Sequence, residues 1–188
     1  MPQTKLYIDT NAYLRLALPL HPLLFRPFCP NKYTIYITHR FQNEFDRQPR
    51  LRKSFSWVNE PEYRANRTQQ ISIPNKNKED IKLAIGYIRD EGINRGLGVQ
   101  DVDIDILAHG YVLEIPIITD DSEMTTLGRT FQIQLWSSLD LMEWMLKCGA
   151  ATQEQLDGVI TYIDKFNDLP WGSYIADYAK RFHNTSHS

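Results

Sequence analysis

Apolar positions along the chain form short β-branched and aromatic runs that alternate with longer helical patterns. The run YTIYIT at 33–38 predicts a buried strand, and 5–8 predicts another near the start of the chain. Within 79–91, apolar residues recur at helical spacing and predict an amphipathic helix. We expect further strands at 116–119 and 131–136, and further helices at 11–18, 39–47, 102–113, 138–147 and 153–165.

This alternation favours an α/β fold over residues 1–136, with a central, mostly parallel sheet between two layers of helices. Residues 137–188 carry helical patterns only, so we expect a helical extension packed on that domain. Its polar tail at 184–188 is expected to be disordered. Segment 48–78 is polar, rich in Arg and Asn and broken by prolines, and the pattern assigns no element to it.

Composition excludes some classes of function. The 188 residues are 42% hydrophobic, which is enough for a core, and carry a net charge of −2. A globally basic nucleic-acid coat is therefore excluded, and any polyanion must be bound by local patches. Residues 100–124 hold seven acids and no Lys or Arg, whereas residues 40–67 hold seven bases and four acids.

Two further features bear on the compartment. Cys29 and Cys148 are far apart and lack metal-ligand spacing, so we expect free thiols in a reducing, cytoplasmic protein, with a disulfide as the alternative. The apolar stretch 12–28 is interrupted by charged residues and prolines. It is expected to be neither a signal peptide nor a membrane span.

Four acids stand at the ends of predicted strands or in the first turns of predicted helices: Asp9, Glu44, Asp103 and Asp121. The carboxyl ends of parallel strands meet at one edge of a sheet, where ligands usually bind. Carboxylates gathered there repel one another unless a cation lies between them. An all-oxygen set suits Mg²⁺ or Mn²⁺, which can polarise a phosphoryl oxygen and activate water. The alternative for Asp9, Asp103 and Asp121 is a helix cap or turn, and for Glu44 a solvated charge.

Taken in order, the pieces YIDTN (7–11), the helix containing Glu44, DIDILA (103–108) and IITDD (117–121) resemble the PIN-domain ribonucleases. These include the toxin nucleases of prokaryotic toxin–antitoxin pairs and several RNA-processing enzymes. Eighteen positions separate Asp103 from Asp121, which is the family spacing and selects Asp103 over Asp101 and Asp105. The resemblance covers about residues 4–136, and residues 137–188 match no known pattern.

The resemblance implies a PIN-like fold and a metal-dependent endoribonuclease in which Asp9, Glu44, Asp103 and Asp121 hold Mg²⁺ or Mn²⁺. It implies that Asn11 and Thr119 orient ligands by hydrogen bonds. Asp120 is expected to be a supporting or structural residue, as are Asp101 and Asp105. An antitoxin protein and a homodimer are the partners that it suggests besides RNA.

An edge this acidic repels phosphate, so basic residues elsewhere must hold the RNA. We expect Arg47, Arg50, Arg52 and Lys53 to do this, with Arg64 and Arg67 further along. Two other functions stay open: a non-catalytic protein of the same fold that binds RNA or a partner, and a haloacid-dehalogenase-like phosphatase. The phosphatase needs a second Asp two positions after the first, where this chain has Asn11.

Overall fold

A four-stranded parallel sheet forms the centre of the computed structural model, which describes residues 3–183. The strands β1 (Thr4–Ile8), β2 (Tyr33–Ile37), β3 (Ile117–Ile118) and β4 (Leu135–Trp136) lie in the order β2-β1-β3-β4. Every neighbouring pair is parallel. The expected α/β class and parallel sheet are therefore confirmed, whereas the tail at 184–188 lies outside the described residues.

Side-chain alternation divides the core into two faces. Leu6 and Ile8 belong to one buried cluster, whereas Tyr7 between them belongs to the other. Ile117 and Ile118 divide in the same way, because successive side chains of a strand point to opposite faces. The sheet is covered on both faces, which explains why its strands are continuous apolar runs.

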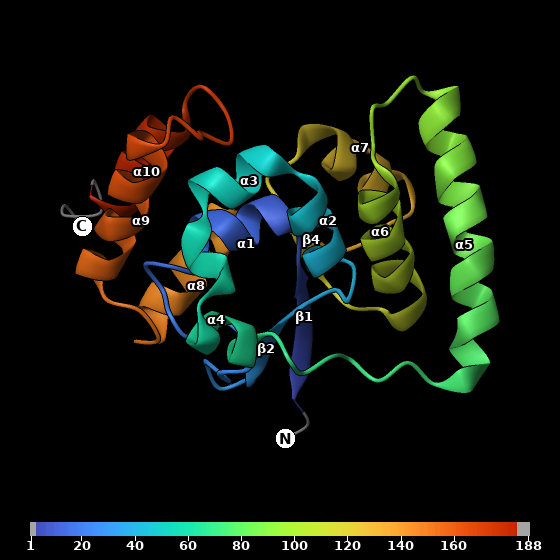
Figure 1. Cartoon of the computed structure of the whole chain (residues 1–188), viewed down its shortest axis with the longest axis horizontal. Helices are drawn as coiled ribbons and strands as arrows, with labels where there is room; N and C mark the ends of the chain where they lie inside the picture. Colours follow the sequence, from blue (N-terminus) through green and yellow to red (C-terminus); the bar gives the residue numbers. More distant parts are fainter. Residues whose placement is uncertain (1–2, 184–188) are drawn as a thin grey trace.

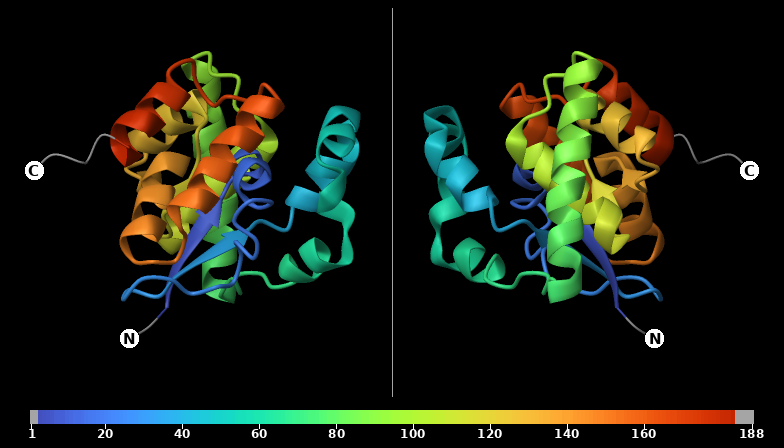
Figure 2. Two further views of the ribbon diagram at one scale, coloured as in Figure 1. Left: turned by 90° about the vertical axis from the view of Figure 1, so that its left-hand side faces the viewer. Right: turned by 90° about the vertical axis from the view of Figure 1, so that its right-hand side faces the viewer.

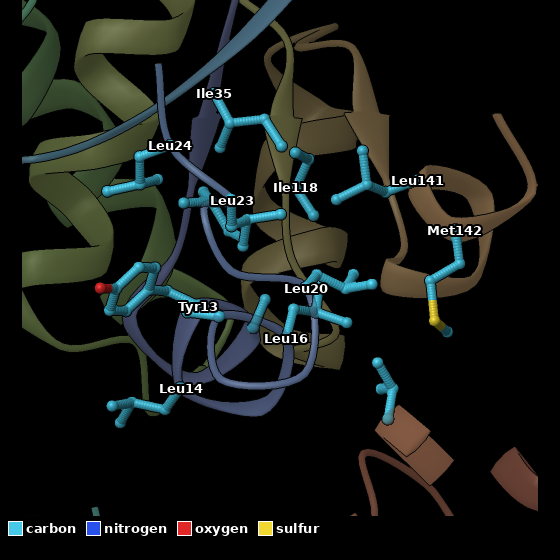
Figure 3. Close-up of a cluster of buried hydrophobic side chains, with 14 of the residues drawn as sticks. Tyr13, Leu14, Leu16, Leu20, Leu23, Leu24, Ile35, Ile118, Leu141 and Met142 are labelled. Carbon is cyan, nitrogen blue, oxygen red and sulfur yellow. The ribbon is translucent and has the colours of Figure 1, made fainter. Parts of the chain in front are cut away.

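Helices form the two outer layers (Figure 1). One face is covered by α5 (Asn75–Asn94), α6 (Asp101–Leu113) and α7 (Ser122–Thr130). The other is covered by α1 (Thr10–Leu16), α8 (Ser138–Lys147), α9 (Gln153–Lys165) and α10 (Tyr174–Phe182). Figure 3 shows Leu16, Ile118 and Leu141 converging in this second cluster. None of the helices between residues 3 and 183 is both long and apolar enough to cross a membrane.

The segment to which the sequence pattern assigned no element is largely helical. It contains α3 (Pro49–Ser54), the 3-10 helix η1 (Ser56–Asn59) and α4 (Pro61–Asn66), which follow α2 (Phe41–Arg47) along one flank of the molecule (Figure 2). Pro49 and Pro61 begin helices instead of ending them. The first helical position needs no N–H donor, and the fixed φ of proline suits it.

Arg67, expected to be available to RNA, is buried instead. Its guanidinium donates to the Val58 carbonyl at 2.8 Å and to the Tyr13 hydroxyl at 3.3 Å, and it lies 5.1 Å from the Phe41 ring centroid. Because the buried guanidinium makes these contacts inside the protein, Arg67 anchors α4 to the core and is not a surface contact for RNA.

Two expectations from the pattern are corrected. The strand expected at 131–136 is only Leu135–Trp136. The residues before Leu135 form the turn that follows α7. Gln132 there has a positive φ of 57°, and the Ile133 N–H donates to the Gly128 carbonyl. Cys29 and Cys148 form a disulfide and are not free thiols. Their Cα atoms are 5.2 Å apart across 119 positions, a proximity that only the packing of α8 reveals.

We predict that Gly110→Ala destabilises the protein by about 1–3 kcal/mol, measured by thermal or urea unfolding. A Cβ at this position in α6 would stand 2.5 Å from Ile117 Cδ1 and 3.0 Å from the Ile115 carbonyl oxygen. Gly86→Ala in α5 is the matched control, since nothing lies within 4 Å of its Cβ. It should be neutral or stabilising. Equal stability of the two variants would contradict the close packing of α6 on β3.

Candidate functional site

The strands end together at one edge of the sheet. Ile8, the last residue of β1, pairs with Ile37 on one side and Ile118 on the other. The ladder continues one step further, because the Asp9 N–H donates to the Ile118 carbonyl at 3.0 Å. Asp9 and Thr119 therefore stand side by side, directly after adjacent strands.

A small pocket of about 60 Å³ opens at this edge, and all four predicted acids line it. They come from four separate segments: the start of α1, the middle of α2, the first turn of α6 and the start of α7. Thr10, Asn11, Glu123 and the loop 98–100 complete the lining, in which no Lys, Arg or His takes part. Among the described residues, the lining of this pocket thus gathers five acids and no basic side chain.

Asp9 is the most deeply buried of the four acids, with 6% of the residue exposed. Burial is the largest cause that raises the pKa of its carboxyl, and the Asp120 charge adds to the rise, whereas hydrogen bonds from Thr119 and Ala12 and the charge of Arg15 oppose it. The resulting pKa is about 7. Its Oδ1 accepts from the Ala12 N–H at 2.6 Å, so Asp9 is also the N-cap of α1.

Glu44 reaches the pocket from α2, whose buried Phe41 and Phe45 fix the helix on the core. The Thr10 hydroxyl donates to its Oε2, and Gln48 Nε2 lies 3.4 Å from its Oε1. Burial raises the pKa of Glu44, and the Thr10 hydrogen bond opposes that rise. Glu44 is therefore a positioned carboxylate and not a freely solvated one.

Asp103 lies near enough to two other acids of the pocket for their charges to raise its pKa. Burial is the largest cause that raises its pKa, and the charges of Glu44 and Asp121 add to the rise, whereas the Gln100 N–H opposes it. The resulting pKa is about 6. That N–H donates to Asp103 Oδ2 at 3.0 Å and closes a capping box at the start of α6. Asp103 is consequently both a helix cap and a member of the acidic cluster.

Asp121 caps α7 in the same manner, because its Oδ1 accepts from the Met124 N–H at 2.7 Å. Its own N–H donates to Thr119 Oγ1 at 3.1 Å. Thr119 thus contacts both Asp9 and Asp121, and Asn11 lines the pocket beside them. Both residues occupy positions from which they can orient a ligand.

The neighbouring acids that sequence spacing set aside lie outside the pocket. Asp120 turns away from it, with Oδ1 accepting from the Ser138 N–H at 2.8 Å and Oδ2 lying 3.7 Å from Arg15. Asp105 is buried against Arg40, whose Nε is 3.0 Å from Asp105 Oδ1. Asp101 is exposed and pairs with Arg89 at 2.9 Å.

Glu123 is a lining residue that the sequence reasoning missed. Its Oε2 accepts from the Gly98 N–H at 3.1 Å and so ties the loop before α6 to α7. A Cβ at Gly98 would stand 3.0 Å from the same oxygen, so glycine permits this approach. The available signal was its position two residues after Asp121, in the first turn of the same helix.

The donor set suits a hard cation, but the side chains are not arranged around one. Among residues 3–183, no three His, Cys, Asp or Glu side chains form a group placed to hold a metal ion. Asp9, Asp103 and Asp121 each commit one carboxylate oxygen to a backbone N–H, which leaves the second oxygen for other contacts. The oxygen ligands fit Mg²⁺ or Mn²⁺ chemically, and binding would require their side chains to turn toward the pocket.

We predict that Asp103→Asn stabilises the protein in chelator near pH 8, by roughly 1–2 kcal/mol. The pKa of Asp103 is raised from 3.8 to about 6. The protonated form of Asp103 therefore favours the folded state at low pH. This contribution to stability is lost as the pH rises from 3.8 to about 6. Asparagine keeps an acceptor for the Gln100 N–H and carries no charge.

Unfolding at several pH values in chelator tests this prediction. The stability difference between variant and wild type should be small near pH 4 and should grow up to about pH 6. Excess Mg²⁺ or Mn²⁺ should stabilise the wild type more than the variant. A variant less stable than the wild type near pH 8 without metal would contradict the crowding of charge.

Comparisons with family models, with curated proteins and with solved structures find no match for this chain. The PIN-domain resemblance therefore rests on the motifs in the sequence. What the protein does has to be argued from the pocket itself.

Proposed function

We propose that the protein is a metal-dependent endoribonuclease that hydrolyses phosphodiester bonds of single-stranded RNA. The observation that carries this proposal is the convergence of Asp9, Glu44, Asp103 and Asp121 on one pocket at the carboxyl edge of a parallel sheet. The helix-capping alternative explains each Asp singly. It does not explain why capping residues from three helices and a glutamate from a fourth line the same pocket.

The four carboxylates would hold Mg²⁺ or Mn²⁺, which when bound can polarise a phosphoryl oxygen and lower the pKa of an attacking water. The protein's own groups would fix the geometry. Thr10 holds Glu44 by a hydrogen bond, and Thr119 contacts both Asp9 and Asp121. Glu123 keeps the loop 98–100 closed against α7.

A basic groove of about 610 Å³ adjoins the acidic pocket and supports RNA as the substrate. The two share Glu44 and Gln100. The groove is lined by Arg40 and Arg47 and by two acids, Glu44 and Asp101, of which Asp101 pairs with Arg89 at 2.9 Å. Buried Asp105 holds Arg40 in place, so this guanidinium is preorganised beside the pocket. Phosphate contacts of this kind position a nucleic acid without reading its sequence.

The four basic residues expected to bind RNA differ in their positions. Arg47 lines the basic groove, and Arg50 lines a separate pocket that shares Gln48 with it. Arg52 and Lys53 stand exposed in the last turn of α3, away from both. Arg47 and Arg50 therefore remain the candidates for strand contacts, and Arg40 joins them.

A non-catalytic protein that binds RNA or a partner through the same edge is the second candidate. The observation in its favour is that no ready-made metal-binding group exists among residues 3–183. A phosphatase of the haloacid-dehalogenase type is disfavoured, because Asn11 lines the pocket where that chemistry needs an acid. If the enzyme is a toxin, its antitoxin would have to cover the acidic edge.

We predict that Asp9→Asn abolishes RNA cleavage in Mg²⁺ or Mn²⁺, a loss of more than about a hundredfold. The amide keeps the oxygen that accepts from the Ala12 N–H but loses the charge that a hard cation needs. Asp90→Asn, at an exposed position on α5, is the control and should cleave normally. Cleavage by Asp9→Asn at the wild-type rate would refute the proposal, and a folded wild type that binds RNA without cleaving it would favour the second candidate.

We predict that Arg47→Ala weakens binding of single-stranded RNA several-fold and flattens its dependence on salt by roughly 0.7 in log–log slope. One fewer phosphate is then neutralised, so fewer counterions are released. Arg52→Ala removes the same charge nearby and should change neither quantity. Fluorescence anisotropy in chelator at several salt concentrations measures both, and equal behaviour of the two variants would remove the groove from the RNA path.

A further inference from the structure

A third pocket, of about 280 Å³, adjoins both the acidic pocket and the basic groove. It shares Asn11 with the acidic pocket and Gln48 with the basic groove. Part of its lining comes from α3 through Arg50, and part comes from the end of α9 through Phe166. The three hollows thus adjoin one another across the edge of the sheet.

Phe166 is an exposed aromatic residue in a supported position. It is 39% exposed, and its ring centroid lies 4.9 Å from that of Tyr162 and 6.1 Å from that of Phe55. Tyr162 is itself fixed by a 2.9 Å hydrogen bond from Trp57 Nε1. The ring is therefore held from behind while it lines the pocket.

The charges around this pocket favour an anionic ligand. Asp168 is its only acidic lining residue among those described, and Arg15 neutralises it through Nε at 3.1 Å. Arg50 is exposed and makes no side-chain hydrogen bond or ion pair within residues 3–183. Lys165 Nζ lies 5.9 Å from the centroid of the Phe166 ring. One aromatic surface therefore stands near two cations, Arg50 and Lys165, and the acid of the lining is paired with Arg15, which Asp120 also contacts at 3.7 Å.

We propose that this pocket binds one nucleotide of a single-stranded polynucleotide, with its base stacked on Phe166 and its phosphate beside Arg50. The inference rests on the proposed function, since the same strand would cross the acidic pocket. An aromatic ring beside a cationic track is how single strands are held without sequence preference. A peptide would have no comparable use for the continuity with a cluster of carboxylates.

This site gives the helical extension a role in substrate binding. The pocket needs both α3 and the end of α9, and the ion pair between Arg15 and Asp168 joins the extension to α1. The four acids lie outside the extension, whereas Phe166 of the stacking wall belongs to it. The extension would then determine how firmly a strand is held, in addition to covering one face of the sheet.

Binding of a fluorescent single-stranded oligoribonucleotide in chelator tests the proposal. Phe166→Ala should weaken affinity about tenfold, the usual cost of losing one stacked base, and Phe166→Leu should weaken it nearly as much. Phe166→Trp keeps an aromatic ring and should bind with the affinity of the wild type. Tyr87→Ala removes a more exposed ring, 68% exposed, from α5 on the opposite side of the molecule (Figure 1), and should bind normally.

An abasic nucleotide moved along the oligoribonucleotide identifies the stacked base. At one position it should weaken binding to the wild type about tenfold and cause no further loss in Phe166→Ala. Wild-type affinity in Phe166→Ala or Phe166→Leu, or additive losses at every abasic position, would overturn the proposal. Cleavage in Mg²⁺ or Mn²⁺ is measured separately. If the wild type cleaves RNA but substitution of Phe166 does not change RNA binding, this site alone is refuted. If the wild type does not cleave RNA but its RNA binding depends on Phe166, the nuclease is refuted.

Discussion

The parallel register of β1 with its two neighbours is the constraint on which the rest of the structure depends. Ile8 is paired on both sides and buried, so the chain must leave the sheet at Asp9, at the level where β2 and β3 also end. A slip of one residue would move Tyr7 to the face that now buries Leu6 and Ile8. Because both faces are apolar and covered, such a slip is costly, and the position of the acidic edge is fixed with the core.

Helix capping and charge clustering are two consequences of the same chain reversals at this edge. A helix that follows a parallel strand starts at the edge where the strand ends, and an Asp is a favoured cap there. Capping holds the side chains of Asp9, Asp103 and Asp121 by backbone N–H groups. Burial raises the pKa of Asp9 and of Asp103, and repulsion from Glu44 and Asp121 adds to the rise at Asp103. These caps therefore cost part of the stability that they supply, which is reasonable where a cation can offset the repulsion.

Sequence patterns predict the parts of the site that depend on local periodicity. Asp9 and Asp121 follow apolar runs, and Asp103 opens a helix, so the parallel sheet predicts acids at one edge. The choice of Asp103 over Asp101 and Asp105 required the family spacing. Glu44 required the order of the motifs, since its helix has no distinctive pattern. Glu123, Phe166 and the Cys29–Cys148 disulfide depend on contacts between distant segments. No periodicity within one segment carries that information, and the same is true of buried Arg67.

Adjacent residues at the end of β3 connect the pocket with the helical extension. Asp121 lines the pocket, whereas Asp120 accepts from the Ser138 N–H at the start of α8. Arg15 lies between Asp120, at 3.7 Å, and Asp168 beyond α9, at 3.1 Å. The charge of Arg15 lowers the pKa of Asp9, and that of Asp120 raises it. Asp168 helps to hold Arg15 in place, and Arg15 in turn contacts Asp120 beside the pocket. The extension is thus joined to the acidic edge by these ion pairs, in addition to the wall that it supplies beside it.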